Sequence, residues 1–299
     1  MEILVKNLTK SFKDVKAINN LSLSIKEGIT GLIGQNGAGK STLLRLISGI
    51  LRPDYGEISI DGHPSESKEA KERVFFLPDA PYSPNGANIE SLLSFYGCFY
   101  DIDRAKFDGL LAKTTLDKKR RINDFSKGMQ RQCFLLLALS VKCPIILIDE
   151  GFDGLDPLIL EIVKEELIEL ESEGKTVLLS SHNLMSLERM ANQFILLSKG
   201  ELGKKGSEED FSMKLVKYQA AFKSPLSKED LEKRGLKVVS YKRIGQVINF
   251  VIVEDDEKIA RLNETEKPLI LEKIPLETNE IFASQMLLAD KGKGGAKDE

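Results

Sequence analysis

The residues best suited to chemistry form one glycine-rich segment near the N-terminus. Gly34-Gln35-Asn36-Gly37-Ala38-Gly39-Lys40-Ser41-Thr42 fits the pattern G-x-x-x-x-G-K-[ST]. An apolar run, Ile29–Ile33, precedes the segment, and apolar residues at helical spacing follow it as far as Ile50. In such a strand–loop–helix, glycines let backbone N–H groups converge on phosphate oxygens, and the helix N-terminus favours negative charge. The segment therefore predicts a nucleotide phosphate site.

Within this site the predicted roles follow from the chemistry of the side chains. Lys40 is expected to contact the β- and γ-phosphates, and the Ser41 hydroxyl to bind Mg²⁺. A chance match to the pattern occurs in roughly a few per cent of chains of this length, and the strand–loop–helix context makes that alternative weaker. The predicted phosphate-binding residues are Gly34, Asn36, Gly37, Ala38, Gly39, Lys40, Ser41 and Thr42.

Two adjacent acids follow a second apolar run. Ile145-Ile146-Leu147-Ile148 precedes Asp149-Glu150, the pattern of a buried strand that ends in carboxylates. Open α/β sheets bind ligands at the carboxyl ends of their strands. We predict that Asp149 orients Mg²⁺ through water and that Glu150 is the general base for the attacking water. An acidic pair alone is more often a solvated strand end, but downstream of a phosphate loop metal binding is favoured.

Further motifs in a fixed order carry a family resemblance. Phe125-Ser126-Lys127-Gly128-Met129-Gln130 resembles the signature L-S-G-G-Q of ATP-binding-cassette (ABC) ATPases, and Asp153-Gly154-Leu155-Asp156 resembles their D-loop. The resemblance covers about residues 2–205. It implies an α/β fold: a P-loop (RecA-like) core with a mostly parallel sheet, an antiparallel β subdomain and an inserted α-helical subdomain. It also implies ATP and Mg²⁺ as cofactors and ATP hydrolysis as the reaction.

The resemblance assigns roles to three more residues. His182, which follows the strand expected at Thr176–Ser180, resembles the switch histidine that holds the γ-phosphate and water together with Glu150. A lone histidine after a strand is otherwise more often structural. Phe12 stands where family members place an aromatic that stacks on adenine, and a core aromatic is the alternative. Asp156, in the D-loop, is expected at the nucleotide.

The signature predicts that the protein works in pairs. Ser126 precedes a helix expected to run to Val141, so its hydroxyl and the backbone at Gly128 can face an anion. In the family that anion is the γ-phosphate of ATP held by the other subunit. Two subunits, as a homodimer or with a paralogue, would close around two ATP molecules and part after hydrolysis. An ordinary N-cap role for Ser126 is compatible with this role.

Two segments depart from the family pattern. Asp79 follows Phe76-Leu77-Pro78, where the family has a glutamine that touches Mg²⁺ and senses the membrane partner. Aspartate can bind Mg²⁺ through oxygen, and a loop-capping role after proline is the alternative. In the signature, Lys127 and Met129 replace a glycine and a glutamine. This Ser-Lys-Gly-Met variant resembles cassettes of two-component bacterial exporters for drugs, antimicrobial peptides or lipids.

Composition indicates the setting of the protein. The net charge of −3 offers no general attraction to nucleic acid, so no nucleic-acid partner is expected. Cys98, Cys133 and Cys143 stand far apart, which indicates reduced thiols and argues against a zinc site. The N-terminus lacks a signal peptide, and the longest strongly apolar stretch, Cys133–Leu139, is too short to cross a bilayer. We expect a protein at the cytoplasmic face of the membrane, held there by a membrane subunit.

Hydrophobic patterns predict strands that alternate with helices, which favours a largely parallel sheet. Between Pro78 and Pro144 helical periods replace strand runs, which predicts a helical subdomain at about 79–144 within a domain of residues 1–205. Residues 206–290 are expected to form a small α+β C-terminal domain, and residues 291–299 a disordered tail. The expected strands include Leu21–Ile25, Ile29–Ile33, Glu57–Ile60, Val74–Leu77, Ile145–Ile148, Thr176–Ser180, Phe194–Leu197, Lys237–Tyr241 and Val247–Val253.

The leading hypothesis is the ATP-hydrolysing subunit of an ABC transporter that drives export through a separate transmembrane permease. The permease is expected to dock on the helical subdomain and on residues 79–87. One alternative is a soluble ABC ATPase of translation, DNA maintenance or cofactor assembly. Such proteins usually carry two cassettes, long heptad arms, zinc cysteines or basic patches, which this sequence lacks. A scaffold without turnover is the other alternative, and the intact Lys40 and Glu150 argue against it.

Overall fold

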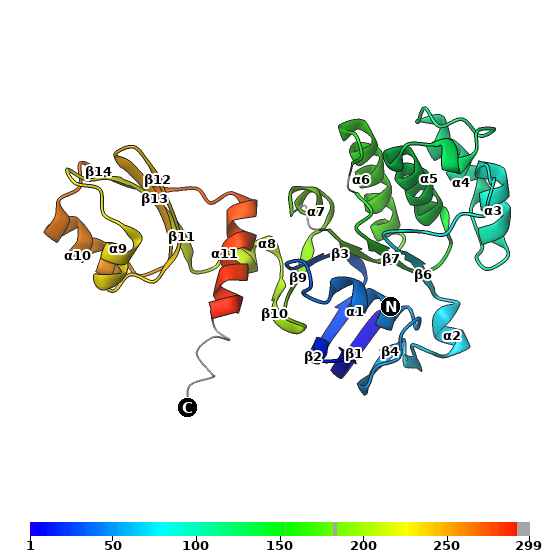
Figure 1. The fold of residues 1–299 in the computed structure, drawn as a ribbon, viewed down its shortest axis with the longest axis horizontal. Helices are drawn as coiled ribbons and strands as arrows, with labels where there is room; N and C mark the ends of the chain where they lie inside the picture. The colour runs from blue at the N-terminus through cyan, green and yellow to red at the C-terminus, as the bar shows by residue number, and fades with distance from the viewer. Residues whose placement is uncertain (153, 182–183, 292–299) are drawn as a thin grey trace. The chain divides into compact units, whose positions relative to one another are not determined.

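The computed structural model describes residues 1–152, 154–181 and 184–291 (Figure 1). The chain divides into an N-terminal unit, Met1–Lys205, and a C-terminal unit, Gly206–Glu299. Each unit has a hydrophobic cluster of its own. Among the described residues, no helix combines the length and the apolar composition that crossing a membrane requires.

The N-terminal unit is organised around a six-stranded sheet with the order β10-β9-β3-β8-β7-β6. The neighbours from β9 to β6 pair in parallel, and β3, β7 and β8 are buried along their whole length. Burial on both faces explains why these strands are continuous apolar runs. Because β3, β8 and β7 are adjacent and parallel, the loops that follow them meet at one edge of the sheet. The strands are β3 (Gly28–Ile33), β6 (Val74–Leu77), β7 (Ile145–Asp149), β8 (Thr176–Ser180), β9 (Gln193–Ser198) and β10 (Glu201–Gly206).

A second, antiparallel sheet has the order β2-β1-β4-β5. Its strands are β1 (Glu2–Phe12), β2 (Val15–Lys26), β4 (Tyr55–Ile60) and β5 (His63–Pro64). Helix α1 (Lys40–Ile47) buries Leu43, Leu44, Leu46 and Ile47 in one cluster with apolar residues of both sheets. Figure 1 shows α1 and the antiparallel sheet on one side of the six-stranded sheet, and α5 and α6 on the other.

The segment between β6 and β7 is largely helical, and it confirms the predicted helical insertion. It contains α3 (Ile89–Gly97), α4 (Arg104–Ala112), a short 3₁₀ helix (Ile122–Asp124) and α5 (Lys127–Ser140). Asn88, Asp103 and Ser126 cap α3, α4 and α5 by accepting backbone N–H groups. From Gln132 to its end α5 is wholly buried, since it packs against α4, α6 (Pro157–Ser172) and β6. The unit also contains α2 (Lys68–Lys71) and α7 (Leu184–Met190).

The C-terminal unit contains a βαββαβ arrangement of the ferredoxin-like kind. Its antiparallel sheet has the order β12-β13-β11-β14. Leu231 of α9 and Leu262 of α10 pack with Val216, Tyr218, Ile248 and other sheet residues in one cluster. The elements are α8 (Glu208–Ser212), β11 (Leu215–Ala221), α9 (Lys228–Lys233), β12 (Val238–Ile244), β13 (Val247–Val253), α10 (Asp256–Glu266), β14 (Ile270–Ile274) and α11 (Thr278–Lys291).

Helix α11 is tied to the rest of the C-terminal unit by an aromatic contact and an ion pair. The rings of Phe211 and Phe282 meet edge to face with centroids 5.2 Å apart. Lys217 Nζ of β11 lies 2.7 Å from Glu280 Oε1. Helix α11 is therefore docked on the C-terminal unit by side chains near its start.

Candidate nucleotide site

The phosphate loop lies where the pattern predicts, between the end of β3 and the start of α1. Lys40 is 6% exposed, and its Nζ donates to the carbonyl oxygens of Gly34 at 2.7 Å and Gln35 at 3.4 Å. The loop is thus folded around the ammonium group of its own lysine. Ser41 and Thr42 follow in the first turn of α1 and are half-buried. Gln35, Asn36 and Gly37 are exposed, whereas Gly34, Ala38 and Gly39 are buried.

The loop offers a cradle to an anion. Gly37 has a φ of +80°, and a Cβ added there would meet no other atom within 4 Å, so the space beside its backbone is open. The first N–H groups of a helix have no intrahelical acceptor. In α1 they also have no capping side chain, because the residue at the N-cap is Gly39. Free N–H donors and a helix N-terminus together suit phosphate oxygens. The residues present therefore fit a nucleoside triphosphate.

Asp149 and Glu150 stand at the carboxyl end of β7, and Ser180 of the neighbouring β8 holds both. The Ser180 hydroxyl donates to Asp149 Oδ1 at 2.5 Å, and it accepts the Glu150 N–H at 3.1 Å. The same N–H also donates to the Ser180 carbonyl oxygen at 3.0 Å. Asp149 is 1% exposed, so the hydroxyl provides a hydrogen bond that this carboxylate would otherwise lack. Both acids are thereby fixed in position.

Glu150 extends from the sheet edge towards the phosphate loop. Its Oε1 lies 3.9 Å from Lys40 Nζ, and its φ is +51°, a left-handed conformation that is uncommon outside glycine. Burial lowers the pKa of Lys40, and the carboxylates of Glu150 and Asp149 oppose this effect. The loop after β3 and the acids after β7 therefore form one charged cluster.

The same cluster contains donors for a divalent cation. The Ser41 hydroxyl and the Asp149 carboxylate are hard oxygen ligands of the kind that Mg²⁺ prefers. Mg²⁺ usually takes only one or two carboxylates from the protein and shares the phosphates of the substrate. The donor set thus fits Mg²⁺ together with a bound nucleotide.

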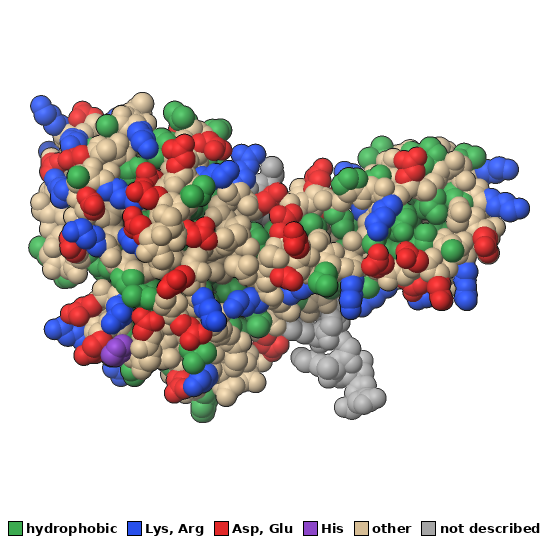
Figure 2. Space-filling view, turned by 180° about the vertical axis from the view of Figure 1, so that it is seen from behind, with side chains coloured by type: hydrophobic (Ala, Val, Ile, Leu, Met, Phe, Trp, Pro, Cys, Tyr) green, Lys and Arg blue, Asp and Glu red, His purple; other side chains and the backbone are tan. Residues whose placement is uncertain are grey.

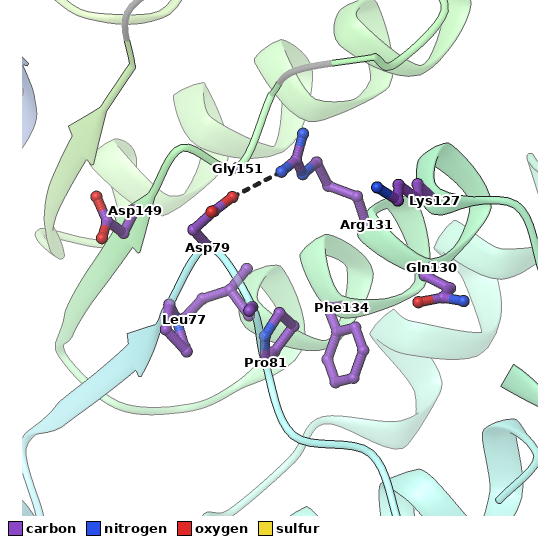
Figure 3. A pocket seen from close by; sticks show the side chains of 11 residues that line it. Leu77, Asp79, Pro81, Lys127, Gln130, Arg131, Phe134, Asp149 and Gly151 are labelled. Atoms are coloured by element: carbon purple, nitrogen blue, oxygen red, sulfur yellow. Dashed lines mark hydrogen bonds and ion pairs between the residues drawn. The ribbon is translucent and has the colours of Figure 1, made fainter. Parts of the chain in front are cut away.

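Asp79 lies beside this cluster and is paired with a cation of the helical segment. Its Oδ1 is 2.7 Å from Nη2 of Arg131, which belongs to α5. Figure 3 shows the two side chains directed at one another. They line a cavity of about 360 Å³, together with Asp149, Gly151, Lys127 and Phe134. Asp79 and Asp149 therefore share one cavity.

The signature residues lie apart from the phosphate loop, since α5 and α1 are on opposite faces of the six-stranded sheet (Figure 1). The exposed Ser126 is the N-cap of α5, and its hydroxyl accepts the Met129 N–H at 3.2 Å. A Cβ added at Gly128 would lie 2.9 Å from the Gly154 carbonyl oxygen, so the signature touches the D-loop of its own chain. Asp156 is the N-cap of α6. Asp153 and His182 lie outside the described residues.

Phe12 ends β1 and is 46% exposed, so it is not a core aromatic. Lys10 Nζ lies 5.7 Å from the centroid of its ring. Three positions into β2, the Ala17 carbonyl oxygen would be 2.4 Å from a Cβ added at Gly39. The start of β2, which pairs with Phe12, therefore passes directly beside the phosphate loop.

Two residues that contact the predicted acids, Ser180 at Asp149 and Arg131 at Asp79, were not predicted from the sequence. Ser180 has a sequence signal, because it ends a strand predicted to lie parallel to the strand of Asp149. Polar residues at the carboxyl ends of neighbouring parallel strands are expected to meet. Arg131 has no such signal, since nothing local relates it to Asp79.

Comparisons with known proteins agree with this geometry. The family model described as ABC transporter matches residues 18–153. The ABC transporter ATP-binding protein NatA of Bacillus subtilis is 32% identical over 221 residues, which cover 69% of this chain and 90% of that protein. The Nod factor export ATP-binding protein I of Burkholderia orbicola is 33% identical over 204 residues, which cover 65% of this chain and 67% of that protein.

A solved structure extends the comparison to the fold. The dimeric structure of a bacterial ABC transporter cassette superposes with a TM-score of 0.58 at 27% sequence identity, over 69% of this chain and 98% of that one. The predicted fold class, a parallel core sheet with an antiparallel β subdomain and helical regions, is thereby confirmed. The chain belongs to the family of ABC transporter ATP-binding proteins, and it is an ATP-hydrolysing, ATP-binding subunit of such a transporter.

Proposed function

We propose that the subunit drives export of a drug, peptide or lipid-like substrate through a separate membrane permease, by dimerising around ATP. The observation that carries the proposal is the convergence of the phosphate loop and Glu150, with Lys40 Nζ 3.9 Å from Glu150 Oε1. This arrangement couples nucleotide contact to an acid that can act on water. Export is supported by the 33% identical relative that is named for export of Nod factor.

In this proposal each residue of the cluster has one task. Lys40 exchanges its bonds to the Gly34 and Gln35 carbonyl oxygens for the β- and γ-phosphates. Glu150 accepts the proton of the attacking water. Ser41, Asp149 and Asp79 would hold Mg²⁺, which would supply positive charge to neutralise the phosphates. Phe12 stacks on the adenine, and His182 contacts the γ-phosphate.

The signature completes the site of a second subunit, which is the same chain or a paralogue. Ser126 and Gly128 stand at the N-terminus of the 14-residue helix α5, on the opposite face of the sheet from α1. A γ-phosphate held by the partner would meet the positive end of this helix. Asp156 of the D-loop would lie at the same interface. A 27% identical cassette of known structure is dimeric, which supports this arrangement.

The permease surface is proposed on the helical segment and on residues 79–87. The exposed rings of Tyr82 and Phe99 flank Phe95, with centroids 5.5 and 5.6 Å from its own. Exposed aromatic groups of this kind are enriched at protein interfaces. Docking there would hold the subunit at the cytoplasmic face of the membrane. Elsewhere, on the face drawn in Figure 2, acidic and basic side chains of the N-terminal unit are interspersed, so that face offers no basic stripe for nucleic acid.

The proposed domain division is an ATP-binding domain of residues 1–205, with its helical subdomain at about 79–144, and an accessory domain of residues 206–290. All residues proposed to bind ATP or Mg²⁺ belong to the first domain. We assign recognition of the exported substrate to the permease, because the cluster formed by the phosphate loop, Asp149 and Glu150 has groups that suit a nucleotide and a cation.

Thiol labelling can test the docking proposal. Cys98 is exposed beside Phe99, whereas Cys133 and Cys143 are buried. Copurification with the permease should protect Cys98 from a maleimide, and the free subunit should be labelled there. The matched control is Ser172→Cys in a Cys98→Ser background, since Ser172 is exposed on α6 and should remain reactive in the complex. Equal labelling of Cys98 in both samples would refute docking on this surface.

A further inference from the structure

The contact between Asp79 and Arg131 joins two parts of the chain that are 52 residues apart. Asp79 follows β6 in the loop proposed to meet the permease, and Arg131 belongs to α5, whose N-cap is Ser126. The Asp79 side chain is 59% exposed and that of Arg131 25% exposed, so solvent can reach the pair. Water access makes the ion pair weak enough to exchange partners.

The same cavity offers Asp79 a second partner. Asp149, a proposed cation ligand, lines that cavity with Asp79 and Arg131 (Figure 3). A guanidinium and a divalent cation on one carboxylate would bring like charges within a few ångströms of one another. The Asp79–Arg131 pair and an Asp79–cation contact therefore oppose one another.

We propose that Arg131 is a positioning residue that holds Asp79 away from the nucleotide site until Mg²⁺-nucleotide draws the carboxylate over. The inference rests on the proposed role of Asp79 at the cation. Exchange of partners detaches the loop after β6 from α5 and ties it to the nucleotide instead. Binding of Mg²⁺-nucleotide thereby changes the contacts of α5, which carries the signature, and of the loop after β6, which is proposed to meet the permease.

The test measures nucleotide binding rather than turnover. Binding of a non-hydrolysable ATP analogue to the full chain is followed by calorimetry, with Mg²⁺ and with EDTA. Arg131→Gln should tighten binding about two- to fivefold with Mg²⁺, the range expected when a solvent-accessible ion pair is removed as competitor. It should have no effect in EDTA. In an Asp79→Asn background the gain should disappear, because no carboxylate remains to be released.

Two further variants separate a positioning role from a structural one. Arg131→Lys keeps the charge and should bind like the wild type. Arg104→Gln removes an arginine from another arginine–carboxylate pair of the same helical segment, with Glu90, outside the cavity. It should leave binding unchanged in both conditions. Thermal melting of each variant confirms folding before binding is measured.

Each outcome bears on a different claim. A gain that persists in EDTA or in the Asp79→Asn background, or no gain from Arg131→Gln, would overturn the inference alone. If Asp79→Asn by itself binds the Mg²⁺ complex like the wild type, the cation role of Asp79 falls and the inference with it. The phosphate loop is judged separately, by loss of binding in Lys40→Met.

Discussion

Lys40 Nζ lies 3.9 Å from Glu150 Oε1, although 110 positions separate the two residues in the sequence. Lys40 is bound to carbonyl oxygens of its own loop, and the Glu150 N–H is bound to Ser180. The lysine is therefore placed by the loop after β3, and the backbone of the glutamate by β7 and β8, which lies between β3 and β7. A phosphate that replaced the loop carbonyl oxygens would meet the lysine beside a carboxylate that is already in place.

Replacement of this carboxylate by its neutral amide should stop the reaction while leaving the nucleotide in the site. In Glu150→Gln we expect ATPase activity to fall at least 100-fold, the scale of general-base catalysis, with ATP binding retained. ATP-dependent dimerisation, measured by light scattering, should become tighter because the γ-phosphate is not removed. Turnover within twofold of the wild type would contradict the assignment of Glu150 as base.

The open space at Gly37 can be tested with a matched glycine. Gly37 and Gly62 both have φ near +80° and no atom within 4 Å of an added Cβ. Alanine at either position should therefore cost a similar amount of stability, about 1 kcal/mol. Only Gly37→Ala should weaken ATP binding, since its methyl group would enter the cradle of the phosphates. Equal ATP affinity of the two variants in calorimetry would argue against this loop as the phosphate site.

Ser180 should matter for stability because it satisfies a buried carboxylate. Ser180→Ala removes the donor to Asp149 Oδ1, and we expect the free energy of unfolding to fall by about 1–3 kcal/mol. The control is Thr176→Val in the same strand, because the buried Thr176 hydroxyl has no hydrogen-bond partner. Valine there should be neutral or stabilising. Urea unfolding distinguishes the two, and similar losses would show that strand packing, not this hydrogen bond, is measured.

Helices α4 and α6 are joined by a largely buried ion pair, and breaking it should make the stability of the protein depend on pH. Lys106 Nζ lies 3.2 Å from Glu166 Oε2. Burial raises the pKa of Glu166, and Lys106 opposes this rise. In Lys106→Met the opposition is lost, so the pKa of Glu166 rises further. We expect a loss of about 2 kcal/mol near pH 8, below the 3–5 kcal/mol of a fully buried pair because the Lys106 side chain is 16% exposed and its other partners, Glu169 and Glu173, are reached by solvent.

The sign of the pH dependence follows from the raised pKa. A carboxyl with a folded-state pKa above its unfolded value contributes stability below the unfolded pKa, and that contribution is lost as pH rises through the folded-state pKa. The deficit of Lys106→Met should therefore shrink from pH 8 to pH 5. Lys106→Met/Glu166→Leu should recover stability at pH 8. As a control, Lys142→Met breaks the exposed pair with Asp101 and should show little change at either pH.

The strands that could be predicted from the sequence are those whose burial leaves a regular apolar pattern. The strands β3, β7 and β8 were recognisable because burial on both faces demands continuous apolar runs. Strand β1 was missed because register shifts after Val5 and Leu8 break its alternation. Strand β14 was missed because its side chains are half-buried or exposed, so no apolar pattern marks it.

The candidate site divides in the same way. The phosphate loop is one contiguous segment, so its backbone geometry is encoded in nine neighbouring residues. The bond from Ser180 to Asp149 spans 31 positions, and the pair of Asp79 and Arg131 spans 52. Such contacts depend on strand order and helix packing, which no local pattern contains.

The left-handed backbone of Glu150 has a consequence for protein engineering. Glycine adopts a φ of +51° without the penalty of about 1–2 kcal/mol that other residues incur. A library of variants screened only for thermal stability should therefore enrich Glu150→Gly. These variants should melt at a higher temperature than the parent protein and should lack ATPase activity. If such a library were sorted separately on melting temperature and on ATP turnover, position 150 should favour glycine in the first sort and glutamate in the second.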